Sequence, residues 1–223
     1  MADFPIVVLA SGRGSNLRAL LAAQHAGALG GARVVRVCSD RAGCGALQSA
    51  REAGIEAVVL DPADFASRAD FDAALFDTVL AGDPHLVVCA GFMRILSDAA
   101  VARTRGRMIN IHPSLLPLYP GLKTHARALA AGDVEHGTTV HQVVATVDGG
   151  PAIAQARVPV LPGDDAAALA SRVLSREHPL LVAVVRDFAE GQLTADPAGV
   201  AWRGIPLHAP LSLNDQDSLA EPI

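Results

Sequence analysis

Short apolar runs alternate with longer Ala- and Leu-rich segments through the first half of the 223-residue chain. Each short run has the length of a buried strand, and the segments between them carry apolar residues at helical spacing. We expect strands at 6–9, 34–38, 55–60, 86–90 and 108–111, and helices around 17–21, 47–53 and 71–80. This order predicts an α/β fold with a Rossmann-like, mostly parallel sheet and helices on both faces.

The second half of the chain has a different pattern. Residues 113–121 hold three prolines and a glycine, which is typical of a loop. Strands are expected at 138–143 and 152–160, so the C-terminal part of the sheet should be mixed. Residues 164–190 are helical in pattern, but Pro179 is expected to kink this helix or to begin a new one.

Charge and composition exclude several classes of protein. The net charge is −5, from 18 Lys and Arg against 23 Asp and Glu, which argues against nonspecific nucleic-acid binding. No apolar run approaches the ~20 residues of a membrane span, so no membrane partner is expected. The three cysteines form no disulfide framework and no secretory signal is present, so we expect a cytoplasmic protein.

The segment from Ser11 to Asn16, Ser-Gly-Arg-Gly-Ser-Asn, lies between the first expected strand and the first expected helix. Glycines let a backbone approach a ligand closely, and free N–H groups at a helix start bind anions. The segment lacks the Gly-Lys-Ser/Thr of a P-loop, and Leu17 stands where a dinucleotide fingerprint has its third glycine. The alternative is a tight turn in which Ser15 or Asn16 caps the helix.

Asn110 and His112 stand two residues apart on an extended segment and therefore point to one side. An amide and an imidazole aimed at one point can stabilise an oxyanion and deliver a proton. The alternative is an ordinary strand-end histidine that is bonded to the backbone.

Two further segments follow expected strands. Residues 91–96 can form an apolar wall for a flat ring, although a helix start that packs on the core explains them equally well. Asp148, in Asp-Gly-Gly, is by itself most simply part of a turn. The remaining histidines show no metal-ligand spacing and no Cys pair accompanies them, so no metal is expected.

Taken in order, these segments resemble the phosphoribosylglycinamide formyltransferase family. The Asn-x-His-x-Ser-Leu-Leu-Pro run is similar to that of formyl-tetrahydrofolate enzymes in general, whereas the Gly-Arg-Gly-Ser-Asn loop and Tyr-Pro-Gly resemble the glycinamide member. The resemblance extends from residue 6 to about residue 190. It implies a formyltransferase domain over 1–190, with a phosphate-binding half (1–105) and a catalytic half (106–190), followed by a short tail (191–223).

The resemblance also implies a reaction. A formyl group would pass from the co-substrate 10-formyltetrahydrofolate to the amine of 5-phosphoribosylglycinamide, a step of de novo purine biosynthesis. The amine would attack directly, through a tetrahedral intermediate and without a metal. The expected partners are these two small molecules, and the sequence does not predict the oligomeric state.

Residue roles follow from the same resemblance. They are Asn110, His112 and Asp148 for catalysis, Gly14, Ser15 and Asn16 for the substrate phosphate, Glu177 for the substrate, and Arg68, Met93, Arg94, Ile95 and Leu96 with Asn110 for the folate. Asp148 beside His112 is expected to raise the pKa of that imidazole by charge proximity. Lys123 departs from the family pattern and is given no role.

Three other functions compete with this one. Methionyl-tRNA formyltransferase would need a C-terminal RNA-binding domain, and formyltetrahydrofolate deformylase would normally carry an N-terminal regulatory domain. The length disfavours both. A non-catalytic nucleotide-binding module would explain Gly12 to Gly14 but would leave Asn110, His112 and Asp148 without a use.

Overall fold

The computed structural model describes residues 3–221. Within them, a nine-stranded sheet has the order β12-β11-β7-β6-β5-β4-β1-β2-β3, and β8, β9 and β10 form a second, three-stranded sheet. The strands are β1 (Phe4–Leu9), β2 (Ala32–Ser39), β3 (Glu56–Val59), β4 (Leu86–Cys89), β5 (Met108–His112), β6 (Glu135–Gln142), β7 (Ala152–Pro159), β8 (Leu193–Asp196), β9 (Gly199–Trp202), β10 (Ile205–Pro206), β11 (Leu211–Leu213) and β12 (Leu219–Ala220). The helices are α1 (Ser15–His25), α2 (Gly45–Glu52), α3 (Arg68–Leu80), α4 (Asp98–Ala102), α5 (Thr124–Ala131) and α6 (Ala166–Ala189), with a short 3₁₀ turn, η1 (Pro62–Asp64).

The direction of the strands changes at β5. From β3 through β2, β1 and β4 to β5, neighbouring strands are parallel, whereas β6 is antiparallel to both β5 and β7. The predicted fold class is therefore confirmed, including the mixed C-terminal part of the sheet. Loops that follow β1, β4 and β5 meet at the carboxyl edge of the parallel portion, where α/β sheets bind their ligands.

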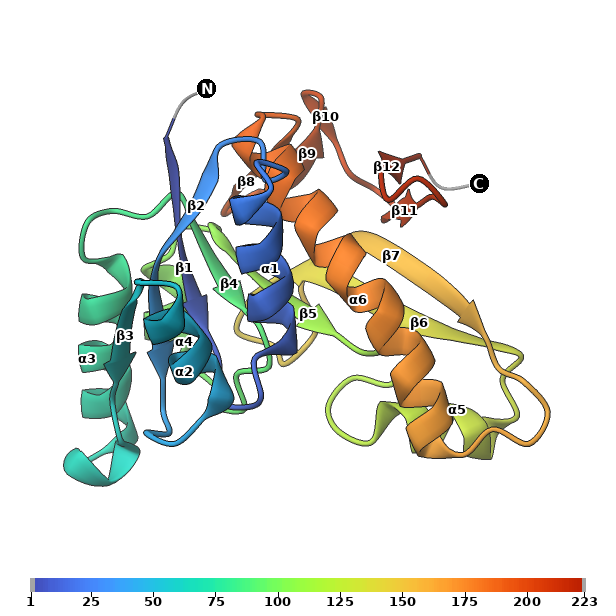
Figure 1. Ribbon diagram of the computed structural model, residues 1–223, viewed down its shortest axis with the longest axis horizontal. Coiled ribbons are helices and arrows are strands. Elements are labelled where there is room, and N and C mark those ends of the chain that lie inside the picture. Colours follow the sequence, from blue (N-terminus) through green and yellow to red (C-terminus); the bar gives the residue numbers. More distant parts are fainter. Residues whose placement is uncertain (1–2, 222–223) are drawn as a thin grey trace.

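Helices cover both faces of this sheet (Figure 1). Along β1, Ile6 and Val8 join the core shared with α1, α2 and α6, whereas Val7 and Leu9 join the core shared with α3 and α4. Alternate side chains of a strand point to opposite faces, so a strand covered on both faces must be apolar throughout. This is why β1 reads in the sequence as an unbroken apolar run.

Helix α6 excludes one of the two alternatives that Pro179 left open. It continues from Ala166 to Ala189 with Pro179 inside it, so no new helix begins at the proline. Proline cannot donate to the carbonyl four residues earlier, here that of Ser175. The turns that follow carry Leu180, Leu181 and Val184, all fully buried, and this packing holds the helix together across the missing bond.

The segment after residue 190, expected as a short tail, is built into the folded body. Strand β11 pairs with β7 and extends the main sheet. Leu193, Val200 and Trp202, from β8 and β9, pack in the same core as α1 and α6. Among the described residues, no helix has the length and apolar character needed to cross a membrane.

Candidate active site

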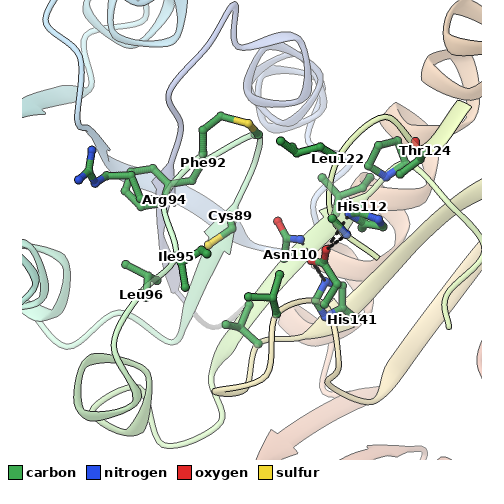
Figure 2. Close-up of a pocket in the computed structure, with 18 of the residues that line it drawn as sticks. Cys89, Phe92, Arg94, Ile95, Leu96, Asn110, His112, Leu122, Thr124 and His141 are labelled. Carbon is green, nitrogen blue, oxygen red and sulfur yellow. Dashed lines mark hydrogen bonds and ion pairs between the residues drawn. The ribbon is translucent and has the colours of Figure 1, made fainter. Parts of the chain in front are cut away.

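A cavity of about 590 Å³ opens at the carboxyl ends of β4 and β5, between the loop before α5 and the loop that follows β6 (Figure 2). One end of it is apolar and is lined by Cys89, Phe92, Met93, Ile95, Leu96, Val101 and Val143. The other end is polar and is lined by Asn16, Asn110, His112, His141, Asp148 and Glu177. We call this cavity the active pocket.

Strand β5 presents Asn110 and His112 to the pocket, two residues apart as expected. Opposite Asn110 on β6 stands His141, and its Nε2 lies 3.0 Å from the Asn110 Nδ2. The other ring nitrogen of His141, Nδ1, lies 3.0 Å from the Gln142 carbonyl oxygen, which can only accept a hydrogen bond. His141 therefore carries its proton on Nδ1 and accepts from the Asn110 amide, which fixes the orientation of that amide.

Asp148 joins this group from the loop after β6, where it has a φ of 50°. Its Oδ2 lies 3.4 Å from His112 Nδ1 and accepts a 2.8 Å hydrogen bond from the Gly121 amide, and its Oδ1 lies 3.6 Å from His141 Nε2. Burial acts to raise the pKa of Asp148, but the adjacent His141 ring, the hydrogen bond from the Gly121 amide and the nearby His112 together outweigh it and lower that pKa. Asp148 is therefore a carboxylate at neutral pH.

The pKa of His112 is also lowered, and this contradicts the rise expected from Asp148. Burial is the largest cause, because it disfavours the charged imidazolium. The Tyr119 carbonyl, 3.0 Å from Nε2, and the Asp148 charge both act in the expected direction but do not offset burial. His112 is therefore mainly neutral at pH 7 in the free protein, with acceptor groups facing both ring nitrogens.

The loop between β5 and α5 supplies two of these contacts, the Tyr119 carbonyl and the Gly121 amide. It is anchored to β6, because the Thr139 hydroxyl donates to the Ser114 carbonyl and accepts from the Leu116 amide. The backbone groups around His112 are thus held by the sheet.

A second histidine pair lies beneath this loop. His136 on β6 is 1% exposed, and its Nε2 lies 3.2 Å from Nδ1 of His125. Burial first, and then the charge of His125, lower the pKa of His136 to about 4. Tyr119 packs edge-on against the His136 ring, so this pair and the loop depend on each other.

We expect stability to fall as pH drops because of His136. Its folded pKa of about 4 lies below its ordinary value of 6.5, so between these values the unfolded chain binds a proton that the folded chain does not. The stabilisation is complete above about pH 6.5 and is lost toward pH 4. In urea unfolding from pH 7 to 4, His136→Gln should lose less stability than the wild type. His208→Gln, at an exposed histidine, should follow the wild type; equal slopes for the His136 variant and the wild type would contradict this account.

Asn16 and Glu177 also line the polar end of the active pocket. Asn16, on α1, donates from Nδ2 to Glu177 Oε2 at 3.0 Å. Within residues 3–221 the buried Asn16 Oδ1 has no hydrogen-bond partner. Burial raises the pKa of Glu177, although the bond from Asn16 opposes the rise. Buried polar groups are usually paired, so the free Asn16 oxygen is suited to a ligand.

Helix α1 begins without a side-chain cap, which excludes the alternative of a tight turn capped by Ser15 or Asn16. The N-cap is Gly14, with a φ of 74°, and no side chain caps the helix, so neither Ser15 nor Asn16 has that role. A Cβ at Gly14 would lie 2.7 Å from the Ala46 Cα. Glycine is therefore required here, because the backbone has a positive φ and α2 approaches closely. A substitution at Gly14 would disturb this packing as well as any ligand bound to the loop.

Two alanine variants in the loop should behave differently. Gly14→Ala is expected to destabilise the fold by at least ~1 kcal/mol, since the alanine is strained at positive φ and meets Ala46. Gly12→Ala adds a Cβ with no atom within 4 Å and should change stability by less than ~0.5 kcal/mol. Urea unfolding measures both, and equal effects would contradict the packing role of Gly14.

The residues expected to bind folate are placed unequally. Met93 and Ile95, 61% and 62% exposed, and the buried Leu96 line the apolar end of the active pocket. The Arg94 guanidinium points away from it (Figure 2), 5.1 Å from the Phe71 ring centre and 3.7 Å from Asp40. Arg94 therefore lines the pocket with its backbone and not with its guanidinium group.

Three expected site residues, Arg68, Gly14 and Ser15, are not among the residues that line the active pocket. Arg68 is the exposed first residue of α3, 3.9 Å from Asp72. Sequence reasoning missed His141 and the apolar lining residues Cys89, Val101 and Val143. The signal for His141 was its place opposite Asn110, which is visible only once the register of β5 and β6 is known. Within residues 3–221, no cluster of three or more His, Cys, Asp or Glu side chains suits a metal ion.

Known proteins share both the sequence and the fold. A model of the formyl transferase family matches residues 5–185. The Escherichia coli K12 phosphoribosylglycinamide formyltransferase is 48% identical over 188 residues, which cover 84% of this chain and 88% of that protein. The chain therefore belongs to the formyl transferase family.

Named relatives within that family indicate the kind of transferase. The phosphoribosylglycinamide formyltransferase structure from Coxiella burnetii matches with a TM-score of 0.88 and 42% identity, over 99% of this chain and all of that one. The Drosophila melanogaster trifunctional purine biosynthetic protein adenosine-3 is 49% identical over 78% of this chain, which spans 13% of that longer protein. The chain thus groups with the phosphoribosylglycinamide formyltransferases, which are one-carbon transferases of purine biosynthesis.

Proposed function

We propose that this chain transfers the formyl group of 10-formyltetrahydrofolate to the amine of 5-phosphoribosylglycinamide in de novo purine biosynthesis. The observation that carries the proposal is the convergence of Asn110, His112 and Asp148 on one wall of the active pocket. The family and the named relatives support the same reaction. We place it in the cytoplasm, in keeping with three free cysteines.

The active pocket fits two different ligands that meet at these residues. Its apolar end, with Phe92, Ile95 and Leu96, suits the flat ring of a folate, and its polar end, with Asn16 and Glu177, suits the hydroxyl and amine groups of the other substrate. The volume of about 590 Å³ lies within the usual range for small-molecule sites. We assign the substrate phosphate to the backbone of Gly14, Ser15 and Asn16, in the half before residue 105, and the chemistry to residues 106–190.

When bound, the folate supplies the formyl carbon that the neutral amine attacks. Negative charge then develops on the formyl oxygen. The Asn110 Nδ2, oriented by His141, donates a hydrogen bond to that oxygen. His112 gives a second hydrogen bond or a proton from the same strand.

Asp148 makes His112 able to act as an acid. The imidazole is mainly neutral in the free protein because burial lowers its pKa. Negative charge on the formyl oxygen adds to that of Asp148 and raises the pKa of His112 as the reaction proceeds. The ring then takes up a proton from solvent, shares it with the formyl oxygen, and returns it to solvent when the intermediate collapses. The proton that the attacking amine loses passes through water to the Asp148 carboxylate and then to N10 of the folate. The bond between the formyl carbon and N10 breaks at the same time, so that the carbonyl re-forms on the product and tetrahydrofolate leaves as a neutral amine.

Formyl transfer is tested directly by absorbance of the tetrahydrofolate product in the presence of both substrates. Product that forms only when phosphoribosylglycinamide is present supports the proposal. Product that forms equally without the amine would instead indicate a deformylase. Calorimetric binding of NAD without binding of phosphoribosylglycinamide would indicate a nucleotide-binding module.

A further inference from the structure

A second cavity, of about 680 Å³, lies beside the loop from Ser11 to Asn16 and outside the active pocket. It is lined by Ser11, Gly12, Arg13, Arg18, Arg41, Gly43, Cys44 and Gly45, and we call it the arginine cleft. None of these residues lines the active pocket, whereas Asn16, farther along the same loop, does. The loop therefore forms part of the wall of both cavities.

The charge of the arginine cleft is opposite to that of the whole chain. Arg13, Arg18 and Arg41 line it and no Asp or Glu does, in a chain of net charge −5. Among the described residues, none of the three arginines lies within 4.0 Å of a carboxylate. The neighbouring Asp40 is buried and faces Arg94 at 3.7 Å. Three cations without counter-charges make this cleft strongly positive.

The backbone around the cleft adds to this field. Helices α1 and α2 follow the parallel strands β1 and β2 and begin at the same edge of the sheet (Figure 1). Neither helix has a side-chain cap or an acidic residue in its first turn. Helix α5 likewise has no side-chain cap, whereas Ser67, Ser97 and Asp165 cap α3, α4 and α6. The start of α1 is assigned to the substrate phosphate, whereas the start of α2, whose Gly45 lines the cleft, adds the positive end of a helix dipole to this field.

The Ser11 side chain ties the wall of the cleft to the segment after β4. Ser11 is 4% exposed, and its Oγ accepts from the Met93 amide at 3.0 Å. This bond fixes the position of Ser11 in the cleft wall.

The walls of the cleft are already ordered. Arg18 donates from Nη1 to the Arg13 carbonyl at 2.6 Å, and the Ala46 amide donates to the Gly12 carbonyl at 3.2 Å. On the other side, the Arg41 amide donates to the Ser39 Oγ at 3.1 Å. The loops that carry the arginines are therefore held in place before any ligand binds, which lowers the entropic cost of binding.

We propose that the arginine cleft is a second anion site, outside the active pocket, for a pyrophosphate-type group. Three guanidinium groups suit a phosphate chain with several charges, because each can donate two hydrogen bonds to phosphate oxygens.

Isothermal titration of the full chain with pyrophosphate at low ionic strength tests this site. The wild type should bind saturably, and Arg13→Gln/Arg41→Gln should bind at least ~10-fold more weakly, because each change removes a charge-assisted contact. Arg51→Gln, at an exposed arginine in the last turn of α2 and outside the cleft, removes one charge as a control and should bind like the wild type. Amide NMR shifts should change at Gly12, Gly43 and Gly45.

A repeat of the titration with saturating phosphoribosylglycinamide separates the two cavities. Pyrophosphate binding that persists supports a separate site, whether or not formyl transfer is the activity. The proposal is overturned if the wild type shows no saturable binding, or if the double variant binds like the wild type. It is also overturned if the substrate abolishes binding and Asn16→Ala weakens it more than the arginine changes do.

Discussion

Replacing His112 with alanine is expected to lower kcat at least ~100-fold, the low end for a positioned general acid. His112 is 6% exposed, stands beside Asn110 on β5, and lies 3.4 Å from Asp148. No other imidazole holds this position, because His141 already accepts from Asn110 through Nε2. Steady-state formyl transfer measures the effect.

The alanine variant needs a test that it is folded. The His112→Gln variant keeps an amide that can donate to the Tyr119 carbonyl but cannot supply an acidic proton, so it should lose kcat as the alanine variant does. Thermal unfolding and the dissociation constant for phosphoribosylglycinamide should stay close to wild type in the Gln variant. Wild-type kcat in either variant would remove His112 from the mechanism.

Asp148→Asn is expected to lower kcat by a similar factor, at least ~100-fold. The change removes the negative charge that raises the pKa of His112 and opposes burial. The pKa of His112 should therefore fall further below its ordinary value in this variant, and the imidazole should be charged only at lower pH. NMR titration of the His112 ring nitrogens measures the shift.

An exposed carboxylate provides the control for this charge change. Asp215→Asn removes a charge that does not line the active pocket and should leave both kcat and the His112 titration unchanged. An unchanged His112 pKa in the Asp148 variant would show that the two groups are not coupled, even if kcat fell.

Much of the sheet was predictable because its strands are buried on both faces. The apolar runs at β1 and β4 have no polar face, and the segments that follow β1 and β4, together with β5 itself, carry most of the site residues. The continuity of α6 was not predictable from Pro179 alone, since it depends on buried neighbours such as Leu180 and Leu181. At Pro179 the packing of buried neighbours determines the helix, although proline itself disfavours a helix interior.

In the active pocket, too, the features that depend on residues distant in sequence were not predictable. The spacing of Asn110 and His112 gave a shared face, because strand geometry is local. The lowered pKa of His112 was missed, because burial is set by every element around the pocket. The direction of Arg94 was missed because Asp40 and Phe71, which hold its guanidinium, lie far from it in sequence.

The pairing of β5 with β6 limits how the length of this chain can vary. Asn110 faces His141 and His112 faces Thr139, and β6 is held on its other edge by β7. Adding or deleting a single residue within β6 would turn each following side chain to the opposite face of the sheet. His141 would then leave Asn110, and the loop before α5 would lose its anchor at Thr139. Insertions and deletions are therefore compatible with catalysis only outside the pair of β5 and β6.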